Sequence, residues 1–118
     1  MSFSKERVSI GDRHSVEILC PLHEIDSLNG EELKNYIIFV ENEIDGIVIN
    51  FSRITYLNSS GLRELIQILK YLRERDKKLI FSCINDDIKK IFVHTNLDRL
   101  FKIVADDDEA QALFNEKN

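Results

Sequence analysis

The sequence predicts a single α/β domain over residues 1–118, with a mixed, mostly parallel sheet, an N-terminal β-hairpin and about four helices. Two short apolar runs rich in β-branched residues, 46–51 and 79–83, indicate buried strands. Amphipathic segments alternate with these runs, which is typical of right-handed βαβ crossovers. The expected order of elements is β-β-α-β-α-β-α-β-α.

The first three elements are expected to be a hairpin and a helix. Residues 8–20 form two β-prone runs around a turn, and Pro21 should end their pairing because it cannot donate to a ladder. Asn29 followed by Glu32 predicts a helix start with a capping box. Apolar residues then recur on one helical face: Leu33, Tyr36, Ile37 and Val40.

The second half continues the alternation. An amphipathic helix is predicted from its apolar face, made of Leu62, Leu65, Ile66, Leu69 and Leu72. Its polar face includes Arg63 and Glu64. Asn85 should start a third helix, 101–104 form a last strand, and the carboxylates of 106–109 suit the first turn of a C-terminal helix, where the dipole favours negative charge.

Composition excludes several classes of function. The net charge of −5 disfavours nucleic acid and anionic membranes as partners. The apolar runs are too short to cross a bilayer, and the N-terminus has no signal-peptide pattern, so a cytoplasmic protein is expected. Cys20 and Cys83 lie in separate strand-like runs and are expected to be buried, reduced thiols. The three histidines share no ligand spacing, so neither a metal site nor a cofactor is predicted.

The segment 54–63, Ile-Thr-Tyr-Leu-Asn-Ser-Ser-Gly-Leu-Arg, is where chemistry is most expected. A strand should end near Leu57, and Asn58, Ser59 or Ser60 should cap the helix that follows. A nucleophilic serine is disfavoured because the leading Gly of G-x-S-x-G is missing. Residues 58–60 also match a glycosylation sequon, but that modification needs a secreted chain.

Two readings of this junction stay open: a plain helix cap with no further role, and a site of phosphorylation. A serine at a helix N-terminus can carry a phosphate of about −1.5 to −2 charges, since the dipole and the free N–H groups tolerate it. A partner docked on the same surface and presenting carboxylates would be repelled. The junction can therefore act as a binding switch without unfolding the domain.

At this point the chain resembles the STAS domain family, and within it the bacterial anti-sigma factor antagonists. The run 47–62 is similar to the family's buried strand followed by an Asp-Ser-Ser-Gly-Leu loop, with Asn58 in place of the Asp. Glu24-Ile25-Asp26 is similar to the Glu-Leu-Asp of the loop before the family's first helix, and 97–103 to its C-terminal pattern.

The resemblance implies a mechanism and a set of site residues. Such antagonists bind an anti-sigma factor kinase, which releases its sigma factor and so regulates transcription. The kinase phosphorylates a serine that matches Ser59, the antagonist dissociates, and a PP2C-type phosphatase resets it. This partner switching implies no catalytic role for the chain. The implied partner-binding residues are Asn58, Ser60, Gly61, Leu62, Arg63, Glu24 and Asp26.

Two other functions stay open at the level of sequence. The chain could be a STAS adaptor that is never phosphorylated, or a regulatory subunit of a transport or lipid-trafficking complex; Asn58 favours this reading because it lacks the usual charge. A small hydrolase using Ser59 or Ser60 is a third alternative, disfavoured because no general base is placed beside either serine.

Overall fold

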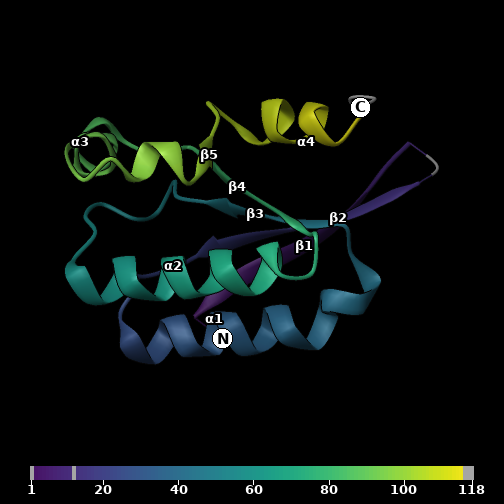
Figure 1. Cartoon of the computed structure of the whole chain (residues 1–118), viewed down its shortest axis with the longest axis horizontal. Coiled ribbons are helices and arrows are strands. Elements are labelled where there is room, and N and C mark those ends of the chain that lie inside the picture. Colours follow the sequence, from purple (N-terminus) through teal and green to yellow (C-terminus); the bar gives the residue numbers. More distant parts are fainter. Residues whose placement is uncertain (1, 12, 116–118) are drawn as a thin grey trace.

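The structure is a computed structural model that describes residues 2–11 and 13–115, and its centre is a five-stranded sheet (Figure 1). The strands lie in the sheet in chain order: β1 (Phe3–Ile10), β2 (His14–Pro21), β3 (Gly46–Asn50), β4 (Lys78–Ser82) and β5 (Lys102–Ile103). β1 and β2 pair antiparallel, and the later pairs are parallel. The predicted mixed sheet with an N-terminal hairpin is confirmed.

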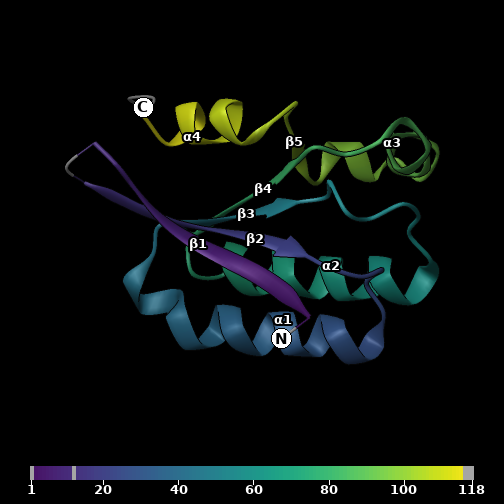
Figure 2. The same ribbon diagram turned by 180° about the vertical axis from the view of Figure 1, so that it is seen from behind.

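Helices cover both faces of the sheet, as Figure 1 and the reverse view of Figure 2 show. They are α1 (Ser27–Val40), α2 (Ser59–Arg73), α3 (Asp86–His94) and α4 (Asp107–Asn115), with short 3₁₀ turns at Glu41–Glu43 and Leu97–Arg99. α1 and α2 lie side by side on one face and α4 lies on the other. The predicted order of strands and helices is therefore confirmed.

The alternation of side chains along each strand divides the core into two layers. In β4, Leu79 and Phe81 face α1, α2 and α3, whereas Ile80 faces α4. The larger layer contains stacked aromatic rings, with the Phe81 centroid 4.8 Å from that of Phe51 and 4.6 Å from that of Phe101. These contacts fix the carboxyl ends of β3 and β4, from which the site loops emerge.

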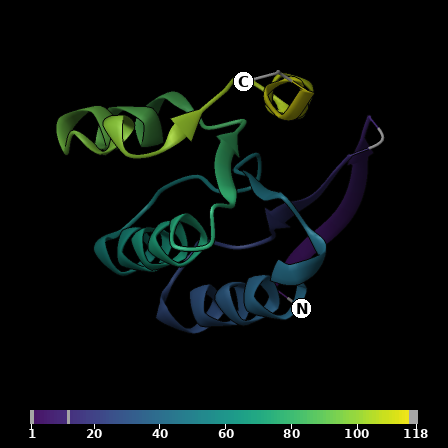
Figure 3. The same cartoon turned by 45° about the vertical axis from the view of Figure 1, so that its right-hand side comes forward.

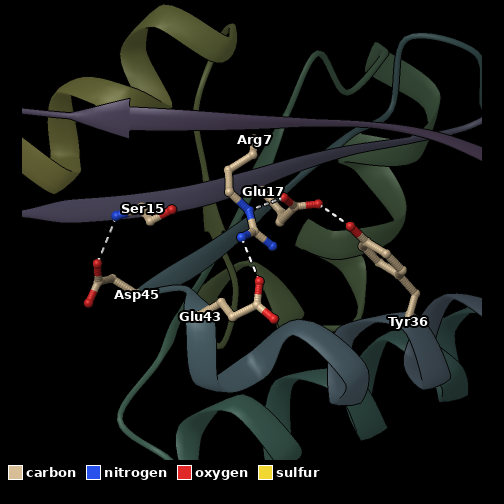
Figure 4. A network of polar contacts seen from close by, with 6 residues as sticks. All are labelled: Arg7, Ser15, Glu17, Tyr36, Glu43 and Asp45. Carbon is tan, nitrogen blue, oxygen red and sulfur yellow. Dashed lines mark hydrogen bonds and ion pairs between the residues drawn. The ribbon is translucent and has the colours of Figure 1, made fainter.

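A buried carboxylate joins the hairpin to α1 (Figure 4). Glu17 of β2 is only 2% exposed. Its carboxylate accepts hydrogen bonds from Arg7 Nε at 2.6 Å and from the Tyr36 hydroxyl, and Arg7 Nη1 also reaches Glu43 at 2.7 Å. Desolvation and the hydrogen bond to Glu17 raise the pKa of Tyr36 to about 12. The network stabilises the outer strands, because a buried charge needs such partners.

The start of α1 differs from the prediction. The N-cap is Asp26, not Asn29: its carboxylate accepts from the amides of Leu28 and Asn29, both at 2.9 Å. Asn29 instead completes the capping box by accepting from Asp26 N at 2.8 Å. The carboxylate of Glu32 accepts from Ser2 N and Ser2 Oγ, both at 2.8 Å, so it has no capping role. An ionised Asp that accepts from two amides is the stronger cap.

Pro21 is the last residue of β2 and lies opposite Phe3, so the prediction that the hairpin pairing ends at Pro21 is confirmed. Two further expectations were wrong in detail. Glu64 is buried rather than solvated, because α2 packs there against Gly30 of α1. Cys20 and Cys83 are half-buried free thiols rather than fully buried ones. Each difference depends on tertiary packing that a single-helix or single-strand pattern does not contain.

Candidate functional site

The site is built on the connection between β3 and α2. The segment 51–58 contains no strand, contrary to the prediction that one ends near Leu57. Ile54 and Leu57 are buried and pack in the core, whereas Thr55 and Tyr56 between them are exposed. The apolar residues that suggested a strand therefore anchor a loop at two points and leave its crest in solvent.

Asn58 begins α2, which decides among the three predicted caps. Its backbone is extended, with φ −98° and ψ 178°, and its Oδ1 accepts from Gly61 N at 2.8 Å and from Ser60 Oγ at 3.0 Å. Ser60 is thereby half-buried and engaged. Ser59 is the first residue of the helix and is exposed. Its hydroxyl is thus the accessible one of the pair.

Gly61 brings a second loop against the start of α2. A Cβ at this position would lie 2.4 Å from the carbonyl oxygen of Ile25, far inside a van der Waals contact. Only glycine allows this approach. The residues expected from two separate motifs, 58–63 and 24–26, are therefore brought together at one end of the molecule.

The carboxylate of Glu24 holds Thr55 and Tyr56, the exposed part of the loop, by hydrogen bonds. Its Oε1 accepts from Thr55 N at 3.1 Å and from Thr55 Oγ1 at 2.8 Å, and its Oε2 accepts from Tyr56 N at 3.2 Å. Partial burial raises the pKa of Glu24, but these three donors outweigh it and hold the pKa below its ordinary value. The carboxylate is ionised at neutral pH, and it positions the loop.

Of the other predicted site residues, Asp26 and Leu62 make contacts within the chain, whereas Arg63 faces the solvent. Asp26 is committed to capping α1, so its carboxylate is occupied within the chain. Leu62 is half-buried against the core. Arg63, one turn after Ser59 in α2, is exposed and forms no ion pair within residues 2–11 and 13–115. Of the predicted charged residues, Arg63 is the one free to contact another molecule.

Three residues at this end of the fold were not predicted to be part of the site. Asn85 caps α3 through Ile88 N at 2.8 Å, and its Nδ2 also donates to Thr55 O at 3.1 Å and Ile54 O at 3.3 Å, which joins a third element to the loop. Tyr56 on the loop crest is 56% exposed, and Leu28 in the first turn of α1 is 81% exposed. Exposed large apolar side chains often mark an interaction surface. The sequence alone does not show which apolar side chains are exposed, so Tyr56 and Leu28 could be recognised only in the structure.

Two observations bear on other kinds of site. Within the part of the chain that the structure describes, no helix combines the length and apolar character needed to span a bilayer. In those same residues, no three His, Cys, Asp or Glu side chains are grouped closely enough to hold a metal ion.

Comparison with known proteins agrees with this fold. The profile of the STAS domain family matches residues 12–110, so the chain belongs to the STAS domain family. A Thermotoga maritima protein assigned as a candidate anti-sigma factor antagonist superposes with a TM-score of 0.83 at 22% identity, over 97% of this chain and 95% of that one.

Two further structures are those of SpoIIAA, an anti-sigma factor antagonist and cell fate determinant of Bacillus. The unphosphorylated form has a TM-score of 0.73 at 18% identity, over 98% of this chain and 99% of that one. The phosphorylated form has a TM-score of 0.69 at 17% identity, over 94% of this chain and 98% of that one. These likenesses establish the fold that the sequence predicted.

Proposed function

We propose that this STAS domain is an anti-sigma factor antagonist of the cytoplasm, switched off by phosphorylation of Ser59. The observation that carries the proposal is the geometry of α2. Ser59 presents an exposed hydroxyl on the first helical residue, while Asn58 and Gly61 hold the backbone around it by a 2.8 Å hydrogen bond. SpoIIAA, which shares the fold, is known in a phosphorylated form.

The chemistry of the helix start supports a phosphate at Ser59. The amides of Gly61 and Leu62 already bond to Asn58, at 2.8 and 3.0 Å, whereas those of Ser59 and Ser60 precede the first intrahelical bond. Free amides and the positive end of the dipole stabilise an anion at this place. The neutral Asn58 adds no repulsion there, unlike the Asp expected from the family. Phosphate can therefore be accepted without unfolding α2.

The surface around Ser59 supports a protein partner. Tyr56 and Leu28 are exposed apolar side chains and Arg63 is an exposed cation. Aromatic and Arg residues are those most often dominant in binding energy at interfaces. The proposed partner is an anti-sigma factor kinase, and the phosphorylated form would be the substrate of a PP2C-type phosphatase. Glu24 and Asp26 contribute by positioning the backbone, and the chain itself catalyses no reaction.

Phosphosite mapping tests the proposal. Wild type, Ser59→Ala and the matched control Ser60→Ala are incubated with ATP and the anti-sigma kinase of the source cell, and the phosphate is mapped by mass spectrometry. Phosphate on wild type and Ser60→Ala, but not on Ser59→Ala, is expected. Stoichiometric phosphate on Ser59→Ala would overturn the assignment of Ser59.

Binding to the kinase tests the switch. Ser59→Asp should lose affinity for the kinase by at least about tenfold relative to wild type, because the added charge lies within the docking surface. Arg63→Ala should lose affinity as well, without any change at Ser59.

A second candidate function, a STAS adaptor that is never phosphorylated, is favoured by Asn58 alone. Asn58→Asp restores the charge expected from the family while keeping the cap. A kinase that modifies Asn58→Asp but leaves wild type unmodified would support the adaptor and contradict the switch.

A further inference from the structure

Arg63 lies one helical turn after Ser59 on the exposed side of α2. Both residues are exposed, and residues four apart on a helix have Cβ atoms about 5–6 Å from each other. Side chains on a helix lean toward its N-terminus, because each Cα–Cβ bond is tilted that way. The guanidinium of Arg63 is therefore directed toward the turn that carries the Ser59 hydroxyl.

Ser59 is the one serine of the described α-helices that has a cation four residues later. Ser27 and Ser60 each have a glutamate at that distance, and α3 and α4 contain no serine. A phosphate on Ser27 or Ser60 would face a carboxylate, whereas a phosphate on Ser59 would face a guanidinium. This spacing distinguishes Arg63 from the other exposed cations of the protein.

The start of α2 has no anion of its own. Its first turn contains no acidic residue, unlike those of α3 and α4, and its cap Asn58 is neutral. The carboxylates of the neighbouring loop are used elsewhere: Glu24 accepts from the loop of residues 51–58, and Asp26 accepts from amides of α1. Neither carboxylate needs Arg63 as a partner, so neither competes with a phosphate for it.

The exposed stripe of α2 continues from Arg63 to Gln67, four residues later. Gln67 Oε1 accepts from Lys34 Nζ at 2.9 Å, and Lys34 belongs to α1, which lies beside α2 in Figure 3. A second cation is therefore already present at that end of the stripe, and like charges repel. Of the two directions along the stripe, the one toward Ser59 is the more favourable for the guanidinium of Arg63.

We propose that a phosphate on Ser59 is bound by Arg63 of the same chain, through charge-assisted hydrogen bonds from the guanidinium to the phosphate oxygens. The inference rests on the proposed function, because it requires a phosphate at Ser59. The planar guanidinium suits this contact, since its donors match two phosphate oxygens at once. Phosphorylation then acts twice on the docking surface: it adds negative charge at Ser59, and it withdraws the cation of Arg63.

The ion pair also defines the chemistry of the partner. A kinase that docks over unphosphorylated Ser59 presents a carboxylate to Arg63, because that is the group whose attraction the phosphate can replace. Phosphate and carboxylate then compete for the same donors of Arg63. The partner is released by this competition together with direct repulsion, and the helix does not need to unfold.

The whole protein with phosphoserine encoded at position 59 during synthesis is the probe, because its preparation needs no kinase. Titration followed by ³¹P NMR measures the second pKa of the phosphate, which is ordinarily about 6. With Arg63 present, this pKa should be lower by about 0.2–0.7 units than in the Arg63→Gln variant, because the guanidinium stabilises the dianion. Arg63→Lys should keep part of the lowering, since it keeps the charge but loses the planar donors.

Arg13→Gln is the matched control. Arg13 is exposed and directly precedes β2, whereas Ser59 follows the carboxyl end of the parallel strand β3, so the two lie at opposite ends of the sheet. This variant should leave the pKa of the phosphate within about 0.1 unit of its original value, because solvent and salt screen charges that far apart. The proposal is overturned by an equal pKa with and without Arg63, or by an equal effect of Arg13→Gln.

Binding to the anti-sigma kinase of the source cell tests the double effect. Phosphoserine at position 59 should weaken binding of the otherwise wild-type chain by a factor at least about threefold larger than in the Arg63→Gln background, where there is no cation to withdraw. Equal factors would contradict the withdrawal of Arg63. A wild type that binds no kinase would contradict the proposed function, while the ³¹P titration still decides whether Arg63 binds the phosphate.

Discussion

Replacing Gly61 by alanine tests how the two site loops are held together. The new methyl group would lie 2.4 Å from Ile25 O and 3.0 Å from Leu57 Cδ1, whereas an ordinary contact begins at 3.4 Å. The closer neighbour is a backbone carbonyl, which cannot rotate away as a side chain can. The loop of residues 24–26 must therefore shift by about 1 Å, by simple comparison of contact distances.

The free-energy change follows from two opposing effects. Forced overpacking costs about 1–3 kcal/mol, whereas alanine in a helix gains up to about 1 kcal/mol over glycine. A net loss of about 1–2 kcal/mol is expected. The entropy of unfolding is about 0.25 kcal/mol/K for a chain of 118 residues, so the melting temperature should fall by about 4–8 °C.

Thermal unfolding followed by circular dichroism measures this change. Asn35→Ala, at an exposed position of α1, is the control and should alter stability by less than about 0.5 kcal/mol. In the Gly61→Ala variant, the amide signals of Thr55 and Tyr56 should also move, because Glu24 lies in the displaced loop. An unchanged or higher melting temperature for Gly61→Ala would refute the close approach of the two loops.

Two further predictions concern the buried and anchoring carboxylates. Tyr36→Phe removes one donor from buried Glu17 and should lower the free energy of unfolding in urea by about 1–3 kcal/mol; an unchanged value would show that Glu17 does not need this partner. For Glu24, the pKa is lower in the folded state than in the unfolded one, so its stabilising effect is present above the ordinary pKa of 4.5 and is lost as pH falls through the folded pKa. Glu24→Gln should therefore be less stable than wild type at neutral pH, with a smaller gap between the two in melts at strongly acidic pH. A gap that grows on acidification would contradict the role given to Glu24.

Local chemistry predicted most of the fold. Runs of β-branched residues predicted the positions of β3 and β4, and apolar residues at helical spacing predicted α1 and α2. The spacing of apolar residues along the sequence directly reflects which face of an element is buried. The sequence predicted that Asn58, Ser59 or Ser60 caps a helix, since capping depends on residues within one turn. The choice between Asn58 and its serine neighbours needed backbone geometry.

Other features depend on residues far apart in sequence. The three donors to Glu24 come from residues about 30 positions away, and the carbonyl that excludes a side chain at Gly61 belongs to another loop. Glu64 was predicted in solvent and is buried, because α1 happens to cross it at Gly30.

A cavity beside β4 is likewise a product of the tertiary structure. It is lined by Leu69 of α2, Leu100 and Leu113 of α4, which lie far apart in the sequence. The sequence by itself determined the order of strands and helices and the helix start at 58–60, because these follow from neighbours along the chain. Only the tertiary structure decided which loops meet at Ser59, because that follows from contacts between distant residues.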